Sequence, residues 1–396
     1  MTSPTEQRRS FDAAIDAYRG GDTARALSIF TVITGAAPTM SDAWLGRMAC
    51  GDQDIDTLAA AHRNSRALYR ETRRIGLPDG TLHARPAAPL YLTMPAWSRA
   101  TIGLAYAAAL IIAGRYDDAV QVLSDPVIAD DAQAAQWHQF ITATVYFATQ
   151  RWPDVREVTA VSPPTHATYA ADEVSAAVAA LSASAAASLG QAQAALALAD
   201  TISTGDPVLA ADVALTRGWC LRELGDAEAA AAAFRAAVVD GQMVPAAREA
   251  LGNPMLRLII TDADTIATRT DRWDPATETS RERRNADALA AEQHAVLAKA
   301  QARLDELIGL DGPKEQIAVW RTEIQIDQLL AEQGWTRREP TKTTWCWKVR
   351  PAPRRPPSRA SSPKSCSGWA KSRAPRSWRS PRRTSSWGSC RRRRNA

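Results

Sequence analysis

Apolar residues recur every three or four positions through the first 250 residues, and this spacing predicts helices. Val and Ile are scattered instead of alternating with polar residues, so we find no hairpin signal in this stretch. Short breaks separate the helices. In the clearest copy, an apolar run over residues 106–112 ends at Gly114, and a second helix then carries Ala119 and Leu123. The pattern predicts an all-α protein built from helical pairs.

The breaks are expected to be the turns of a helical-repeat solenoid. They lie at residues 20–22, 114–116, 150–152, 190 and 225–226. Those at Arg151, Gly190 and Gly225 are roughly 35 to 40 residues apart, which is the period of tetratricopeptide-like repeats. Small Ala and Gly residues allow paired helices to approach closely, and Gly can take the left-handed conformation that ends a helix. We therefore predict a tetratricopeptide-like helical repeat domain over residues 1–252.

The pattern changes after this region. Pro254 ends a helix, because the residue before a proline disfavours helical geometry. Residues 256–261 are rich in Leu and Ile, which favours a strand, and residues 265–268 are expected to return as its partner. We expect a short β-hairpin or finger near residues 253–270 that closes the solenoid.

The rest of the chain is expected to contain helices and irregular segments. A polar linker is expected to begin at Trp273 and to include the solvated stretch from Arg281 to Arg284. Charged helices are expected over about residues 285–307 and 313–333. After residue 252 we expect three further regions. They are the β finger and linker over residues 253–284, a helical lead-in to a missing ATPase module over residues 285–335, and a disordered tail over residues 336–396.

Charge divides the chain at about residue 340. The tail from Thr341 to Ala396 holds 17 Lys and Arg and no acid, whereas the rest holds 31 basic and 43 acidic residues, a net charge of −12. The body therefore gives no reason to expect nucleic-acid binding. Apolar residues make up 45% of the chain, yet no apolar stretch approaches the roughly 18 residues of a transmembrane helix. The N-terminus lacks the apolar region of a secretory signal, so we expect a cytoplasmic protein.

The body shows no arrangement of side chains typical of an active site or a metal site. Cys50 and Cys220 lie far apart in helical contexts, and they are interpreted as structural. Asp117 and Asp118 open a helix, where acids favour the dipole. We predict no catalytic, cofactor-binding or metal-binding residue. The other residues considered, as packing, surface or tail residues, are Trp44, Trp137, Trp152, Trp219, His62, His83, His138, His166, His294, Cys346, Cys366 and Cys390.

Several stretches resemble the EccA proteins, the cytosolic ATPases of the mycobacterial type VII (ESX) secretion systems. They begin with Ser41-Asp42-Ala43-Trp44-Leu45-Gly46-Arg47 and Gly51-Asp52, and continue with residues 70–76, 151–155 and 251–275. Residues 308–317 are similar to the entry to the AAA+ module of that family. The resemblance covers roughly Asp12 to Gly334 and is greatest to the ESX-2 member.

The resemblance implies a tetratricopeptide-like N-terminal domain that precedes an AAA+ ATPase of the CbxX/CfqX type. Such proteins are hexameric motors that use ATP and Mg²⁺, engage secreted substrates or components of the secretion machinery, and promote export. The implied function of this chain is therefore protein binding by the N-terminal domain. A hexamer is expected only where the AAA+ module is present.

The family pattern breaks where a phosphate-binding loop is expected. After Pro340 the family has a strand and then G-P-P-G-T-G-K-T-T, whereas no GxxxxGK[ST] occurs in this chain. As written, the chain is expected to bind no ATP and to have no cofactor. A shifted reading frame from Thr344 onward permits M-V-L-E-G-P-P-G-T-A-K-T-T. We therefore expect that the frame is lost between about Thr336 and Thr341.

Two alternative functions remain open. If the frame reads through, the protein is an intact secretion ATPase. If the basic tail is genuine, Arg391 to Arg394 and the five tail tryptophans could bind nucleic acid through phosphate contacts and stacking, which would make the protein an adaptor.

Overall fold

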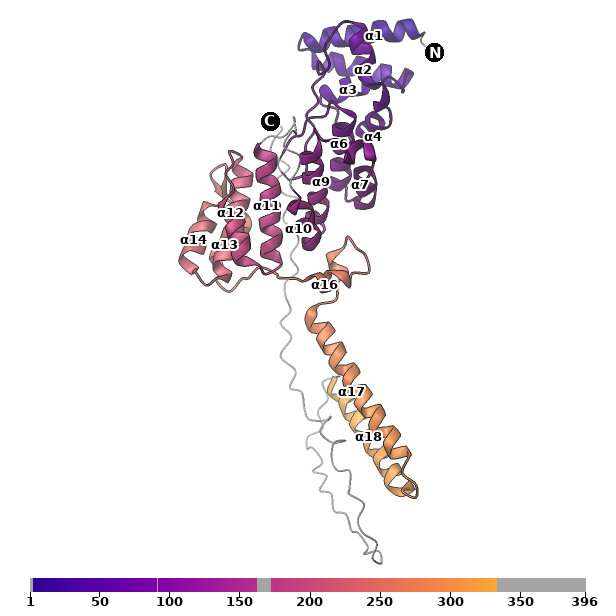
Figure 1. The fold of residues 1–396 in the computed structure, drawn as a ribbon, viewed down its shortest axis with the longest axis vertical. Coiled ribbons are helices and arrows are strands. Elements are labelled where there is room, and N and C mark those ends of the chain that lie inside the picture. The colour runs from indigo at the N-terminus through magenta and orange to yellow at the C-terminus, as the bar shows by residue number, and fades with distance from the viewer. Residues whose placement is uncertain (1–2, 91, 162–171, 333–396) are drawn as a thin grey trace, which may run out of the picture. The chain divides into compact units, whose positions relative to one another are not determined.

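The computed structural model describes residues 3–90, 92–161 and 172–332 (Figure 1). The chain divides into two compact units, Met1–Ser280 and Arg281–Ala396. We call the first the helical domain. The described part of the second is two helices, which we call the helical pair. The expected disordered tail over residues 336–396, its cysteines, and His166 lie outside the described residues.

The helical domain is built from helices of 4 to 17 residues. Its first half contains α1 (Pro4–Arg19), α2 (Thr23–Ala36), α3 (Ser41–Ala49), α4 (Ile55–Arg63), η1 (Ser65–Ala67), α5 (Arg70–Arg74), α6 (Arg99–Ile112), α7 (Tyr116–Leu123) and α8 (Pro126–Ala129). Its second half contains α9 (Ala135–Ala148), α10 (Trp152–Ala160), α11 (Asp172–Ser188), α12 (Ala192–Asp200), α13 (Pro207–Glu223), α14 (Ala227–Ala236), β1 (Val238–Val239), β2 (Gln242–Met243), α15 (Pro245–Gly252), α16 (Ala263–Ala267) and η2 (Pro275–Thr277).

The turns of the solenoid are where the sequence predicts them. They join α1 to α2, α6 to α7, α9 to α10, α11 to α12, and α13 to α14, and the helices of each pair pack side by side (Figure 1). Four of these turns contain a glycine with positive φ, and the fifth uses Gln150 in the same left-handed region. Asp22 and Asp226 then accept first-turn N–H groups of the second helix. These observations confirm an all-α, tetratricopeptide-like solenoid.

Glycine sets the closest helix contacts, as the small residues predict. A Cβ added at Gly46 would lie 2.5 Å from the Phe30 ring, and one at Gly218 would lie 2.4 Å from the Phe234 ring. Both phenylalanine side chains are fully buried. A side chain at either glycine would therefore force the paired helices apart.

One core extends through most of the solenoid. It begins with Phe11 in α1 and continues to Val213 in α13, and it also takes in Trp273 from a segment late in the chain. Trp137 is 3% exposed and meets Phe140 edge-on, with ring centroids 6.0 Å apart. Smaller clusters cover the remaining helices up to α15.

The expected β finger near residues 253–270 is wrong. Residues 256–262 contain no helix, turn or bend, but they pair with no described strand. The expected return strand is a helix, because the Asp262 side chain accepts a hydrogen bond from the Thr265 N–H and caps α16. The segment that reads as a hairpin is therefore one isolated straight stretch followed by a helical turn.

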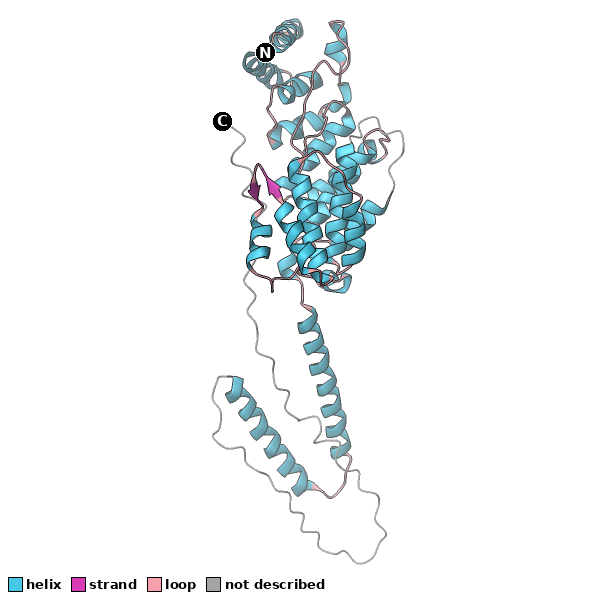
Figure 2. Cartoon of the chain, turned by 90° about the vertical axis from the view of Figure 1, so that its left-hand side faces the viewer, coloured by secondary structure: helices cyan, strands magenta, loops and turns pink. Residues whose placement is uncertain are grey.

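A hairpin does occur earlier, in the part of the chain for which we expected none. Strands β1 and β2 pair antiparallel around Asp240 and Gly241, which both have positive φ (Figure 2). Asp-Gly is a strong signal for a two-residue hairpin turn. It was missed because strands of two residues are too short to show alternation.

The helical pair consists of α17 (Arg281–Asp305) and α18 (Asp311–Glu332). The stretch from Arg281 to Arg284, expected to be linker, is the first turn of α17, since Arg and Glu are good helix formers. None of the described side chains of the helical pair is buried. In the described part of the chain, no helix is long and apolar enough to cross a membrane.

Candidate functional site

Cys50, Cys220 and His62 are packed in the helical domain, whereas His83 is exposed there and His294 is exposed on α17. Burial raises the pKa of the Cys50 and Cys220 thiols to about 11, so both are protonated at neutral pH. His62 stacks on Tyr106, and burial lowers the pKa of its imidazole. Within the described residues, no group of three or more His, Cys, Asp or Glu could hold a metal ion. The informative features are instead two joints between distant parts of the chain.

The first joint is centred on Asp42, which is fully buried in α3. Its carboxylate accepts hydrogen bonds from the backbone N–H groups of Tyr69, Glu71 and Thr72, at 2.5, 2.8 and 2.8 Å, and from the Thr72 hydroxyl at 3.0 Å. Burial raises the pKa of this carboxyl, and the four donated bonds oppose the rise. Asp42 therefore caps the short helix α5 from 27 residues away or more.

The same stretch contains a second polar cluster. The Arg47 guanidinium is paired with Asp52, with Nε to Oδ2 at 2.8 Å, and donates to the hydroxyls of Thr34 and Thr57. It also lies over the Trp44 ring, 4.9 Å from the centroid. These contacts tie α3 to its neighbours α2 and α4.

The second joint is made by residues 253–280, which we call the connector. Trp273 reaches back across more than 150 residues, and its indole Nε1 donates to Asp117 Oδ1 at 2.9 Å. The ring packs between Tyr116 and Tyr146, with centroids 5.7 and 6.3 Å away, and only 9% of Trp273 is exposed. The expected polar linker therefore begins with a core residue. Asp117 lies at the start of α7, as predicted, and it also anchors the connector.

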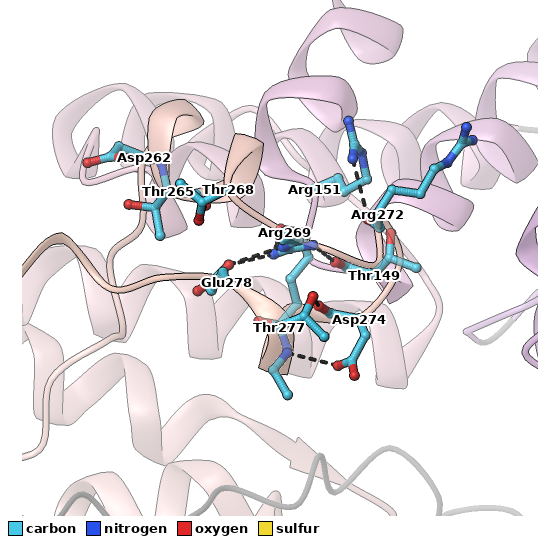
Figure 3. A network of polar contacts seen from close by, with 12 residues as sticks. Thr149, Arg151, Asp262, Thr265, Thr268, Arg269, Arg272, Asp274, Thr277 and Glu278 are labelled. Atoms are coloured by element: carbon cyan, nitrogen blue, oxygen red, sulfur yellow. Dashed lines mark hydrogen bonds and ion pairs between the residues drawn. The ribbon is translucent and has the colours of Figure 1, made fainter. Parts of the chain in front are cut away.

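Arg269 binds the connector to the α9–α10 turn (Figure 3). Its guanidinium donates to the backbone carbonyls of Thr149 and Gln150, at 2.6 and 3.2 Å. These carbonyls lie at the end of α9, where the helix supplies no further N–H groups to pair with them. It is also paired with Glu278 at 3.0 Å, and its side chain is only 2% exposed. Arg151 completes the contact by donating to the carbonyl of Arg272 at 3.3 Å.

The α11–α12 turn contacts the first part of the connector. The Thr261 N–H donates to the Ser188 carbonyl at 3.0 Å, and Ile260 covers Gly190, where an added Cβ would lie 3.2 Å from the isoleucine. The connector thus contacts the α6–α7, α9–α10 and α11–α12 turns in succession. These contacts hold the turns of successive repeats in one arrangement.

The stretches used for the family resemblance meet at these two joints. Asp42 contacts residues 71 and 72 of the second stretch, and Arg151 contacts Arg272 beside the Arg269 joint. These stretches therefore take part in folding contacts between distant parts of the chain. Sequence spacing alone could not bring these pairs together, because 27 to 121 residues separate the partners.

Comparison with known proteins gives this architecture a family. The model of the "T7SS, ESX-1 secretion system protein EccA1, N-terminal domain" matches residues 10–279. The chain belongs to the EccA family. This match ends next to Ser280, where the compact helical domain also ends, so the connector is part of the EccA N-terminal domain.

Relatives in several ESX systems share this sequence. The ESX-2 secretion system protein EccA2 of Mycobacterium tuberculosis is 36% identical over 349 residues, which cover 83% of this chain and 56% of that protein. The ESX-5 secretion system protein EccA5 of the same organism is 36% identical over 313 residues, which cover 78% and 50%. The chain spans about half the length of these relatives. The ESX-2 match confirms the expected resemblance.

A solved structure supports the fold. The crystal structure of the N-terminal domain of EccA1 ATPase from the ESX-1 secretion system of Mycobacterium tuberculosis aligns with a TM-score of 0.59 and 27% identity. The alignment covers 69% of this chain and 98% of that one.

Proposed function

We propose that this chain is the protein-binding N-terminal part of an EccA-type secretion ATPase, acting in the cytoplasm on secreted ESX substrates or on components of the secretion machinery. The family supports the setting, and the solenoid supports the binding role, since stacked helical pairs present extended surfaces for partner proteins. Among the described residues, the buried Asp42 caps a helix and Asp52 pairs with Arg47, which are structural roles.

The connector is the observation that carries this proposal. It contacts three successive turns of the solenoid and continues directly in sequence into α17. A partner that changes the stacking of the repeats must therefore strain or release these contacts. The connector is therefore suited to transmit the effect of partner binding from the solenoid to the polypeptide that follows it in sequence.

We further propose that ATP hydrolysis, Mg²⁺ binding and hexamer formation belong to a longer parent protein. Relatives about twice as long as the matched region support this, and the solved relative is the N-terminal domain of an ATPase. The intact mass of the protein from its native host tests the proposal. A mass near 42.8 kDa contradicts a longer parent, whereas a much larger mass accompanied by ATP hydrolysis supports it.

The binding role is tested with the secreted ESX proteins of the host organism. We expect the purified full chain to bind at least one of them in titration calorimetry, and deletion of the gene to stop its export. Binding by none of them, together with unchanged export, would overturn the proposed function. Gly218→Val, which disrupts the α13–α14 contact, is the matched loss-of-fold control.

A further inference from the structure

The straight stretch at the start of the connector has the features of one strand of a sheet without its neighbour. Leu256 and Leu258 are partly buried against the core clusters of α11 to α15, whereas Arg257 and Ile259 are exposed. This alternation has the period of a strand that lies with one face on the protein. Ile259 is 68% exposed, and the preceding Met255 is 80% exposed.

Both ends of this stretch are fixed, and its middle is not hydrogen-bonded. The Leu256 carbonyl accepts from Arg222 at 3.1 Å, and the Thr261 N–H donates to Ser188. Between them, the backbone N–H and C=O groups of residues 257–260 form no hydrogen bond with any described residue. Consecutive open donors and acceptors on a fixed, straight backbone are what a sheet edge offers to another strand.

The charge at this edge is positive and uncompensated. Arg257 is exposed, and within the described part of the chain its guanidinium donates to the carbonyls of Pro254 and Leu256. Arg222 donates to the carbonyls of Ala250, Asn253 and Leu256. Among the described residues, neither arginine forms an ion pair. Burial lowers the pKa of Arg222, and repulsion from Arg257 lowers it further, so the two charges lie close enough to interact.

We propose that residues 255–260 are a docking edge for an extended segment of a partner protein, which adds to this edge as a strand and presents carboxylates to Arg257 and apolar side chains to Met255 and Ile259. This proposal rests on the proposed function in one respect: the partner is taken to be a protein that the domain binds in secretion. It gives the binding role a surface and a chemical preference.

A second copy of this chain fits the edge poorly. Two copies paired antiparallel through this short segment would bring the two Arg257 guanidinium groups to the same small interface, where like charges oppose association. An acidic partner removes this repulsion and neutralises the charge that the domain leaves unpaired.

The test uses a fluorescein-labelled octapeptide that alternates Glu and Val, titrated with the full chain at low ionic strength and followed by anisotropy. We expect saturable binding that Arg257→Glu weakens about tenfold, while Arg25→Glu, the same charge change on an exposed arginine of α2, leaves it unchanged. Arg257→Glu is then expected to bind the matching Lys and Val peptide. Circular dichroism checks that each variant is folded.

Backbone pairing is tested separately from charge. An acidic peptide N-methylated at alternate residues keeps its carboxylates but loses strand donors, and we expect it to bind at least about tenfold more weakly. No saturable binding up to millimolar peptide, equal binding by the Arg257→Glu variant, or equal binding of the N-methylated peptide would overturn the proposal. A self-association that Arg257→Glu leaves intact and that blocks the peptide would also overturn it, in favour of a second copy.

The two proposals fail in different ways. If a secreted ESX protein binds the chain but neither the octapeptide nor Arg257→Glu affects it, the docking edge is wrong and the proposed function stands. If the octapeptide binds as described but no secretion protein binds, the docking edge stands and the proposed function is wrong.

Discussion

The helical domain and the helical pair both consist of helices, but they bury their apolar side chains to very different extents. In the helical domain, Phe11, Phe140 and Phe234 are fully buried. In the helical pair, Leu289 of α17 and Val319 of α18 are each 54% exposed. Each inner helix of a solenoid has neighbours on both sides, whereas two helices alone cannot cover both of their apolar faces. Burial therefore follows from the neighbours that the stack of repeats supplies, together with the more apolar composition of core helices such as α6 and α9.

The largest effect is expected from removing a core side chain of the helical domain. Phe140→Ala deletes a fully buried ring and should lower the free energy of unfolding by about 3–5 kcal/mol. Urea unfolding of the full chain, followed by circular dichroism, measures the change. The matched substitution in the helical pair is Leu289→Ala, which should cost less than about 0.5 kcal/mol. Equal losses for the two variants would contradict the difference between the regions.

An intermediate effect is expected where the connector joins the helical domain. Arg269→Ala removes a nearly buried guanidinium, leaves the Thr149 and Gln150 carbonyls without this donor, and should cost about 2–3 kcal/mol. Hydrogen exchange should rise across residues 262–279. Arg25→Ala is the control, since that arginine is exposed on α2, away from the three turns that the connector contacts. A connector that exchanges equally in both variants would show that Arg269 does not hold it.

The smallest effect is expected at Asp212, a charged group inside the solenoid. Burial raises the pKa of this carboxyl from its ordinary 3.8 to about 7, and repulsion from Asp206 adds to the rise. The folded state therefore binds the proton more tightly than the unfolded state does, and its stability falls as the pH rises from about 4 to about 7. Asp212→Asn should stabilise the protein at pH 8, where the buried carboxyl ionises, and should have almost no effect at pH 4. A pH-independent difference between the two proteins would contradict this assignment.

Features set by residues close together in the chain were predictable from the sequence, and features that need a distant partner were not. Helix pairs and their turns were predictable, because Gly, Asp and the apolar spacing act within a few residues, as at Gly114 and Gly225. The β finger was predicted wrongly, because the composition of residues 256–261 favours an extended backbone but cannot supply a partner strand. Asp262 instead starts α16 by a local cap. The candidate docking edge follows from that missing partner, so only the structure could reveal it.

By itself, the sequence determined the helical class, the period of the repeats, and the stretches that resemble the EccA family. These properties depend on residue type and local spacing. Tertiary structure alone decided that Asp42 caps α5, that Trp273 joins the core beside Tyr116, and that Arg269 closes the end of α9. Each of these contacts joins residues far apart in the chain, and its stability comes from burial that exists only once the solenoid has formed.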